Sequence, residues 1–205
     1  MSPEVTARKE ALRRVANERR SGLDSVRAET AGRCLTDRLV AGTEYRFARH
    51  LAVYLSVAGE ISTGPLIARA RADGKALCLP AWLENSGKYD WVEFNPGERL
   101  GRGPFGIPQP ERLTPLVAIP VDLVVVPGLA FDAQGGRLGH GKGIYDRLLV
   151  RPLVCGAFKI GWAFDFQMWD EIPRTERDVC LDEVMTETYD YRTPRASEKN
   201  KEERS

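Results

Sequence analysis

The sequence predicts an α/β fold, a three-layer α/β/α sandwich built around a mainly parallel sheet. Short apolar segments alternate with helical patterns along the chain, and this alternation is typical of parallel strands joined by right-handed crossovers. Residues 123–126 are apolar at every position, as expected of a central strand buried on both faces. The 205 residues suit a single domain, which we assign to residues 1–191, and the polar residues 192–205 are expected to form a disordered tail.

The N-terminal part of the chain predicts two helices. A basic amphipathic helix is expected to about residue 20, with Ser2 as its N-cap and an end at the pair Ser21-Gly22. A second helix is expected over residues 24–41. The positions of this second helix that we expect to face the core are Val26, Ala31, Cys34, Leu35 and Leu39.

A strand, a helix and a second strand are expected next. Residues 51–57 are apolar and rich in strand formers, helix-start signals follow at 62–65, and residues 76–79 form another apolar segment. Residues 82–115 are dense in glycine, proline and aromatic residues, so they predict a long irregular excursion with one strand around 91–94. Long loops of this kind are usually functional.

The C-terminal third of the domain completes the predicted alternation. A glycine-rich turn follows the apolar strand at 123–126, and a short helix is expected from about Tyr145. Two further strands are expected around residues 155–161 and 183–187. The strand at 123–126 therefore becomes the expected centre of the sheet.

Composition excludes several classes of protein. Thirty basic residues balance 29 acidic ones, and a net charge of +1 gives no global field that would attract nucleic acid. The four cysteines lie far apart and the chain has two histidines, so neither a zinc site nor a disulfide framework is indicated. We expect buried thiols in a reducing compartment. The N-terminus lacks an apolar leader and no long apolar run is uninterrupted, so a cytoplasmic location without membrane insertion is expected.

A glycine-rich loop directly after the predicted central strand indicates an anion site. Gly139, Gly141 and Gly143 alternate with His140 and Lys142, which leaves backbone N–H groups accessible to a phosphate. Ligands of open α/β sheets bind beyond the carboxyl ends of strands, so the position suits a binding site. The spacing approaches a Walker A loop, but Gly143 occupies the position of the magnesium-binding hydroxyl. A flexible turn with scattered charges is the alternative.

The whole segment carries a more specific pattern. It reads Pro127-Gly-x-Ala-Phe-Asp-x-x-Gly-x-Arg-Leu-Gly-x-Gly-x-Gly-x-Tyr-Asp-Arg147, and it resembles the signature of the 5-formyltetrahydrofolate cyclo-ligase family, also called methenyltetrahydrofolate synthetase. The resemblance extends over about residues 5–187. The other matching positions are Lys9-x-x-x-Arg13, Tyr54-Leu55-Ser56 with Glu60 and Thr63, Phe105-Gly-Ile-Pro-Gln-Pro110, and Asp178 with Asp182-Glu183-Val184.

The resemblance implies a ligase that converts 5-formyltetrahydrofolate to 5,10-methenyltetrahydrofolate with ATP and Mg²⁺, releasing ADP and phosphate. It also implies the three-layer α/β/α fold. An N-formyl amide is a poor electrophile, and phosphorylation of its oxygen turns that oxygen into a leaving group that N10 displaces. The protein then needs to supply charge neutralisation and positioning, as in other phosphoryl transfers.

The resemblance also implies roles for individual residues. Arg137 and Lys142 would be catalytic, and Asp146 and Asp178 would hold magnesium. The implied ATP-binding residues are Lys9, Arg13, Arg137, Leu138, Gly139, His140, Gly141, Lys142, Gly143, Ile144 and Tyr145. The implied folate-binding residues are Leu55, Glu60, Phe105 and Tyr145.

Each of these assignments has a structural alternative. Lys9 and Arg13 could belong to a solvated basic helix face, and Phe105 could be a simple core aromatic, as could Trp91. The chain has Ile144 where the family usually has a first tyrosine, and Trp91 where a methionine is common, so both departures fall on the expected folate wall.

Two other functions are kept as alternatives. One is a non-catalytic folate- or nucleotide-binding paralogue, which Ile144 leaves open. The other is a nucleic-acid-binding module that uses the basic first helix, which the near-neutral charge disfavours. The expected partners are therefore small molecules, without nucleic acid or membrane, and the sequence leaves the oligomeric state open.

Overall fold

The computed structural model of the chain describes residues 3–116 and 119–194. Both N-terminal helices form as expected, and the Asp24 side chain caps the second by accepting a hydrogen bond from the Arg27 N–H. The predicted N-cap of the first helix, Ser2, lies outside the described residues. The helices are α1 (Pro3–Arg20), α2 (Ser25–Ala41), α3 (Thr43–Phe47), α4 (Gly64–Ala72) and α5 (Ile144–Leu149), with short 3-10 turns η1 (Pro104–Gly106) and η2 (Asp165–Gln167).

The strands form one large sheet and two small ribbons within the described residues. They are β1 (His50–Ala52), β2 (Ala76–Leu83), β3 (Lys88–Phe94), β4 (Leu100–Arg102), β5 (Pro108–Pro110), β6 (Leu123–Val126), β7 (Ala130–Phe131), β8 (Arg137–Leu138), β9 (Phe158–Trp162), β10 (Glu183–Met185) and β11 (Asp190–Arg192). The seven-stranded sheet has the order β11-β10-β9-β6-β1-β2-β3, and the ribbons are β4-β5 and β7-β8. All pairs in the large sheet are parallel except β2-β3 and β10-β11.

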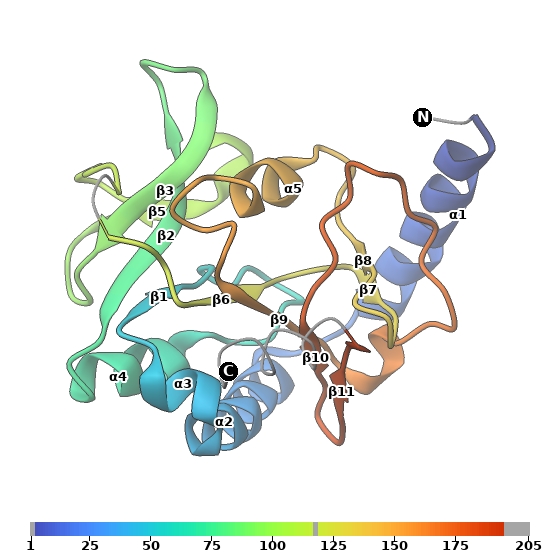
Figure 1. Ribbon diagram of the computed structural model, residues 1–205. Coiled ribbons are helices and arrows are strands. Elements are labelled where there is room, and N and C mark those ends of the chain that lie inside the picture. The colour runs from blue at the N-terminus through green and yellow to red at the C-terminus, as the bar shows by residue number, and fades with distance from the viewer. Residues whose placement is uncertain (1–2, 117–118, 195–205) are drawn as a thin grey trace.

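Helices on both faces of the sheet give the predicted sandwich (Figure 1). Helices α2, α3 and α4 cover one face, while α5 lies on the other. Strand β6 is the middle strand, and its side chains alternate between the two cores: Leu123 and Val125 pack toward α2, while Val124 and Val126 pack toward α5. The α/β class and the doubly buried central strand are therefore confirmed.

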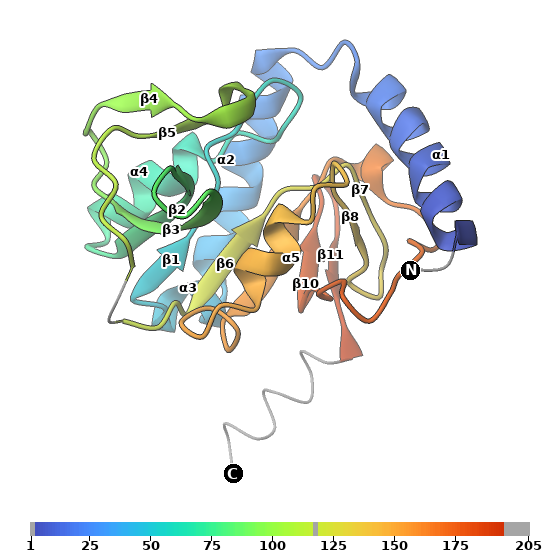
Figure 2. The ribbon, with the colours of Figure 1, turned by 90° about the horizontal axis from the view of Figure 1, so that it is seen from above.

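Helix α1 stands apart from these layers and packs on the small β7-β8 ribbon. Ala16 forms a third apolar cluster with Leu129, Ala130 and Leu138. Figure 2, which views the molecule from above, shows α1 at one end, the β4-β5 ribbon at the other, and α5 between them. No helix among the described residues is both long and apolar enough to cross a membrane.

The excursion predicted over residues 82–115 contains a β-hairpin, and its second strand, β3, includes the strand expected around residues 91–94. Strand β2 continues through Pro80 to Leu83 and pairs with β3 over seven positions. Strand β1 pairs with β2 only at residues 76–78. Pro80 lies beyond this pairing, so the sheet tolerates its missing N–H donor on that side of β2. In Figure 1 the end of this hairpin extends beyond the other strands of the sheet.

The first strand is shorter than the sequence predicts. Strand β1 ends at Ala52, and residues 53–57 leave the sheet. Tertiary hydrogen bonds turn the chain there: the Tyr54 hydroxyl donates to the Ile61 carbonyl at 2.9 Å, and the Thr63 hydroxyl donates to the Tyr54 carbonyl at 2.6 Å. These bonds depend on residues up to nine positions away, which periodicity does not register.

Other predictions about burial are wrong at particular residues. Val26 is 72% exposed and Cys34 is exposed, because helix α2 buries the stripe of Ala31, Leu35 and Leu39 and both residues lie off it. Cys155 is also exposed and precedes β9, so among the four free cysteines only Cys78 is buried.

The folded domain extends into the predicted tail. Arg192, its first residue, lies in β11, a strand that the sequence pattern did not predict, and Thr193 is buried with its hydroxyl donating to the Asp182 carbonyl at 2.9 Å. Antiparallel pairing with β10 forms this strand. The remainder of the predicted tail, residues 195–205, lies outside the described residues.

The turn between β7 and β8 depends on the fully buried carboxylate of Asp132. It accepts hydrogen bonds from the N–H groups of Gln134 at 3.0 Å, Gly136 at 2.7 Å and Ile172 at 2.8 Å. Gly136 must be a glycine, because a Cβ there would lie 2.3 Å from a carboxylate oxygen of Asp132. The turn therefore fixes the backbone that enters the glycine-rich loop.

We predict that Asp132→Ala lowers the free energy of unfolding by about 3–5 kcal/mol, because two buried N–H donors and one part-buried N–H donor lose their acceptor at about 1–3 kcal/mol each, partly recovered by relaxation. Urea denaturation would measure the loss. The matched control is Asp170→Ala, at an exposed carboxylate, for which a change within about 0.5 kcal/mol is expected. Equal stability of the two variants would contradict the assignment.

Candidate active site

A large cavity opens at the carboxyl ends of β1 and β6. It has a volume of about 1170 Å³, and its wall includes Tyr54 and Leu55 after β1 and Pro127 and Gly128 after β6. Strand β1 connects onward to β2 on one side, while β6 lies on its other side. The cavity therefore lies where the strand order reverses, which is the usual ligand position in open α/β sheets.

The structure brings the residues that the sequence singled out to this one cavity. Of the sixteen residues with an assigned role, only Phe105 is not part of the described wall, since the structure describes its backbone but not its side chain. The fifteen that line the cavity are Lys9, Arg13, Leu55, Glu60, Arg137, Leu138, Gly139, His140, Gly141, Lys142, Gly143, Ile144, Tyr145, Asp146 and Asp178.

The glycine-rich loop connects β8 to α5 along the cavity wall. Gly141 and Gly143 have φ values of +89° and +60°, a backbone region that other residues rarely adopt. Gly143 is also the N-cap of α5. A Cβ at Gly139 would lie 2.9 Å from Nη1 of Arg137. The glycines thus allow both the tight turn and the close approach of a cation.

Arg137 and Arg13 bring two guanidinium groups to this loop. The Arg137 side chain is 5% exposed and donates to the carboxylate of Asp146 at 3.1 Å. Its Nε is buried without a hydrogen-bond partner among the described residues. Arg13, from α1, donates through Nε to the Gly139 carbonyl at 2.9 Å. Helix α1 therefore takes part in the site, and the alternative of a merely solvated basic face is wrong for Arg13.

Lys9 forms the tightest ion pair of the cavity. Its Nζ donates to both carboxylate oxygens of Asp178 at 2.7 Å, and the two side chains are 8% and 19% exposed. Asp178 also accepts from the N–H and hydroxyl of Thr175 at 2.6 and 2.8 Å. Burial raises the pKa of the Asp178 carboxyl, but the hydrogen bonds from Lys9 and Thr175 outweigh it and hold the pKa below 3.8. Asp178 is therefore anionic at neutral pH.

His140 lies among the cations of the loop. Burial lowers its pKa below 6.5, and the positive charges of Arg20, Arg13, Lys142 and Arg137 lower it further. The imidazole is consequently neutral at pH 7. It therefore adds no positive charge to the arginines and the lysine around it. An anion bound there would favour the protonated imidazole and so shift the pKa of His140 upward.

Another part of the cavity wall contains the half-buried carboxyl of Glu60, together with Tyr54 and Leu55 from the segment after β1. Glu60 Oε2 accepts a hydrogen bond from the Val57 N–H at 3.1 Å. Burial raises the pKa of Glu60, while that hydrogen bond and the charge of Arg20 lower it by less. Tyr145 also lines the cavity, and the centre of its ring lies 5.5 Å from Cζ of the Arg137 guanidinium. Burial raises the pKa of its hydroxyl well above 10.0.

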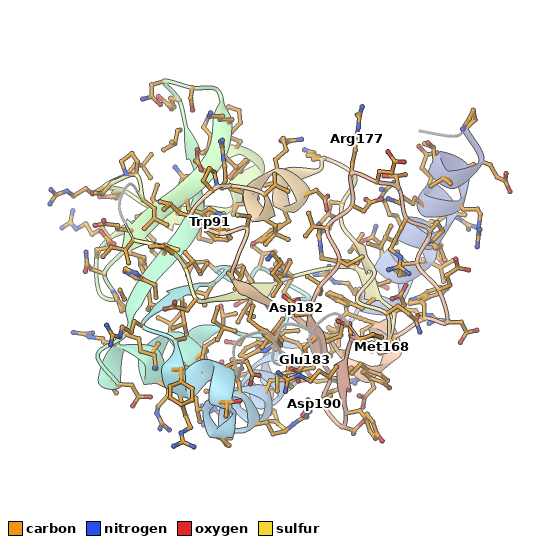
Figure 3. All side chains as sticks on the ribbon, in the orientation of Figure 1. Trp91, Met168, Arg177, Asp182, Glu183 and Asp190 are labelled. Carbon is orange, nitrogen blue, oxygen red and sulfur yellow. The ribbon has the colours of Figure 1, made fainter. Side chains whose placement is uncertain are left out.

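Trp91 is a core residue and does not line the cavity. It is 2% exposed, its indole N–H donates to the Leu148 carbonyl at 3.1 Å, and its ring meets Tyr145 edge-on at 6.4 Å. The expectation that it forms part of the wall is therefore wrong, and the core alternative is confirmed. Figure 3 labels this side chain. The other departure, Ile144, does line the cavity and also packs on the core beneath α5.

Sequence reasoning missed several residues of the wall. Thr175 holds Asp178, the Val179 N–H donates to Asp146 at 3.4 Å, and Tyr89 and Arg102 approach from the excursion. Arg177 also borders the cavity, but its side chain points outward in Figure 3. No local pattern marks these positions, because they reach the site through contacts distant in sequence.

The carboxylates of Asp146 and Asp178 suit a hard cation such as Mg²⁺. The Val179 N–H, next to Asp178, donates to Asp146, so the two carboxylates belong to one segment of the wall. No group of three or more His, Cys, Asp or Glu side chains among the described residues could bind a metal alone. Magnesium often binds through one or two carboxylates plus substrate phosphates and water, so two are sufficient.

Comparison with known proteins relates this site to a family. The family model described as 5-formyltetrahydrofolate cyclo-ligase family matches residues 5–187. The chain belongs to this family. The predicted class, a ligase enzyme, is confirmed by the match and by the similar proteins. Membership also agrees with the extent of the resemblance found in the sequence.

Relatives of the cyclo-ligase family match over nearly their whole length. A 5-formyltetrahydrofolate cyclo-ligase of Mus musculus is 30% identical, covering 89% of this chain and 95% of the mouse protein. One of Escherichia coli K12 is also 30% identical, covering 82% of this chain and 94% of the other. The matches therefore extend over most of this chain and over nearly all of both relatives.

Two solved structures resemble the fold. The NMR structure of Aquifex aeolicus 5,10-methenyltetrahydrofolate synthetase is 32% identical with a TM-score of 0.76, covering 91% of this chain and 93% of the other. A 5,10-methenyltetrahydrofolate synthetase from Mycoplasma pneumoniae is 22% identical with a TM-score of 0.62, covering 86% and 96%. At that identity the second structure supports the fold alone.

We predict that Lys9→Met lowers the free energy of unfolding at pH 7 by about 1–3 kcal/mol, because it leaves the partly buried Asp178 carboxylate without its cation, discounted for solvent screening. The stabilisation is present above pH 3.8 and is lost as pH falls through the lowered pKa of Asp178. Urea denaturation against pH measures it.

The matched control for this experiment is Arg8→Met, which removes an exposed ion pair with Glu171 on the same helix. We expect a change within about 0.5 kcal/mol. A loss in Lys9→Met no greater than in this control would show that the Lys9 pair does not anchor α1.

Proposed function

We propose that this chain converts 5-formyltetrahydrofolate to 5,10-methenyltetrahydrofolate, with ATP hydrolysed to ADP and phosphate. The observation that carries the proposal is that one cavity combines two unlike sets of lining residues. The first set comprises the glycine-rich loop, cations and two carboxylates, and the second comprises Glu60 with apolar residues such as Leu55 and Val57. A nucleotide triphosphate suits the first set and a pterin suits the second.

The reaction needs phosphoryl transfer before ring closure. The formyl oxygen attacks the γ-phosphorus of ATP, a P–O bond to ADP breaks, and the formyl carbon becomes electrophilic. N10 then attacks that carbon and loses its proton, and the C–O bond breaks with phosphate as the leaving group. The protein residues position the reactants and stabilise charge, which is how phosphoryl transfer is generally catalysed.

The cations of the loop would bind the phosphates of ATP. Arg137 is held under the loop by Asp146, and Lys142 lies in the loop itself. Lys9 and Arg13 extend the positive wall from α1, one helical turn apart. Backbone N–H groups of residues 139–143 complete the phosphate site. Because Arg137 and Lys142 would contact the transferred group, they are the proposed catalytic residues.

Asp146 and Asp178 would hold Mg²⁺ together with the phosphates. When bound, the ion would offset part of the negative charge of the phosphates. Arg137 and Lys9, which pair with these carboxylates in the structure, would then be available to phosphate oxygens. Arg137 and Lys9 would therefore pair with the two carboxylates before the nucleotide binds and with its phosphates afterwards.

Glu60, Leu55 and Tyr145 would bind the folate. A carboxylate at Glu60 can accept hydrogen bonds from the amino and ring N–H groups of the pterin, and apolar side chains can cover its faces. Phe105 remains a further proposed contact. Ile144 offers apolar surface here, where many relatives are expected to have a tyrosine hydroxyl. Because this departure concerns the folate contact, we expect the phosphate chemistry to be unaffected.

The direct test is the appearance of methenyl absorbance when the protein is mixed with 5-formyltetrahydrofolate and magnesium ATP. Formation of the product with stoichiometric ADP supports the proposal. Binding of either ligand without turnover would favour the alternative of a non-catalytic folate- or nucleotide-binding paralogue. ATP hydrolysis in the absence of folate would contradict both the proposed reaction and the paralogue alternative.

We predict that Lys142→Ala and Arg137→Ala each raise the KM for ATP about tenfold to a hundredfold, because each removes a charged hydrogen bond to phosphate worth about 1.5–3 kcal/mol. Initial rates against ATP concentration measure the effect. Lys88→Ala, at an exposed lysine of the β2-β3 hairpin, is the control. Unchanged ATP kinetics in both variants would remove these residues from the site.

We predict that Asp146→Asn needs about tenfold more Mg²⁺ for its half-maximal rate, because the amide binds a hard cation more weakly than a carboxylate. A magnesium titration at saturating ATP and folate measures the shift, with Asp170→Asn as the exposed control. A titration that superimposes on that of the wild-type protein excludes Asp146 as a ligand.

We predict that kcat/KM for the folate falls on acidification as Glu60 is protonated, because protonation occupies the oxygen that accepts the pterin N–H. Burial raises the pKa of Glu60 above 4.5, so the fall begins at a higher pH than for an ordinary glutamate. In Glu60→Gln the rate is low throughout and its ratio to wild type rises at low pH. A constant ratio across pH would contradict the role of Glu60.

A further inference from the structure

Among the cations of the cavity wall, Arg102 belongs to neither the glycine-rich loop nor α1. Arg102 lies in β4, within a segment of residues 100–110 that we call the β4-β5 arm. Its neighbours on the cavity wall are Gly106, Ile107 and Pro108. In Figure 2 the arm lies at the opposite side of the molecule from α1, with α5 between them. Arg102 is thus separated from the proposed phosphate site.

The backbone that carries Arg102 is firmly attached. Arg102 pairs with Pro108 in the ribbon, and the Gly103 N–H donates to the Ile107 carbonyl at 2.9 Å. Two contacts fix the arm to the β2-β3 hairpin: the Trp82 N–H donates to Gln109 Oε1 at 2.9 Å, and the Tyr89 hydroxyl donates to the Pro104 carbonyl at 3.1 Å. The position of Arg102 at the cavity is therefore determined by the fold.

The charge of Arg102 has no partner among the described residues. Its side chain forms no ion pair or hydrogen bond with them, whereas Asp146 and Asp178 pair with Arg137 and Lys9. The guanidinium lies near Gly106, where a Cβ would be 3.9 Å from its Nη1. An exposed guanidinium on an otherwise apolar stretch of cavity wall can bind a ligand carboxylate through two parallel hydrogen bonds.

We propose that Arg102 binds the carboxylates of the glutamyl tail of the folate substrate and so selects substrates with an acidic tail. The proposal rests on the proposed function. With the pterin at Glu60 and the formyl group toward the phosphate loop, the rest of the substrate extends along an available wall. Ile107 and Pro108 offer that wall apolar surface, which suits the benzoyl ring, and Arg102 meets the charge that follows it.

The experiment compares two substrates in two proteins. The substrates are 5-formyltetrahydrofolate and its α,γ-diamide, which keeps N10 and the size of the tail but removes both negative charges. The variant is Arg102→Gln, and the control is Arg99→Gln, an exposed arginine near the arm that does not line the cavity. Methenyl formation gives KM values for both substrates and for ATP.

We expect Arg102→Gln to raise the KM for the folate about tenfold, as for the loss of one charged hydrogen-bonded pair. The KM for the diamide and the KM for ATP should stay within about twofold of wild type, and Arg99→Gln should match wild type throughout. An equal effect on both substrates, or a raised KM for ATP, would overturn the inference. Arg102→Lys should recover part of the affinity because the charge is kept.

Equilibrium binding separates this inference from the proposed reaction. If the wild-type protein forms no methenyl product, the proposed function fails. Binding of the acid and the diamide to wild type and Arg102→Gln then still measures the tail contact. If wild type turns the folate over and Arg102→Gln binds both compounds as wild type does, only the inference about Arg102 fails.

Discussion

Parallel pairing of β1 with β6 is the constraint on which the rest of the site depends. The register Leu51 to Leu123 and Ala52 to Val124 directs both strands to the same edge of the sheet. The chain after β1 supplies Glu60, and the chain after β6 supplies the glycine-rich loop. Because Leu51, Ala52 and all of β6 are fully buried, a shift in register would move side chains between the two cores and displace the residues that line the cavity.

Four charges of the site are paired with one another in the structure. Asp178 binds Lys9 and Asp146 binds Arg137, and these four side chains are mostly buried. Paired charges at low exposure stay in fixed positions, because losing a partner leaves an uncompensated charge. Under the proposed function, a bound triphosphate would replace the carboxylates as the partner of Lys9 and Arg137. These two cations would then be held in place for an anion before it binds.

Helix α1 links the two halves of the cavity. Lys9 and Arg13 contact the phosphate side, while Arg20, at the end of the same helix, donates to the Gly59 carbonyl at 2.9 Å, next to Glu60. The charge of Arg20 also acts on both Glu60 and His140. Any tilt of α1 would therefore change the phosphate end and the apolar end together, since a helix moves as a rigid element.

The sequence by itself determined the features that depend on local pattern. It gave the apolar strand at 123–126, the second helix over residues 24–41 and the glycine loop, because burial, helix formation and positive φ each require particular residue types nearby. The resemblance to a family supplied the chemistry. Only the tertiary structure decided that Lys9 meets Asp178 across 169 positions, that Trp91 is buried behind the wall, and that Arg102 reaches the cavity. These contacts arise from packing between distant segments, which leaves no periodic signal in the chain.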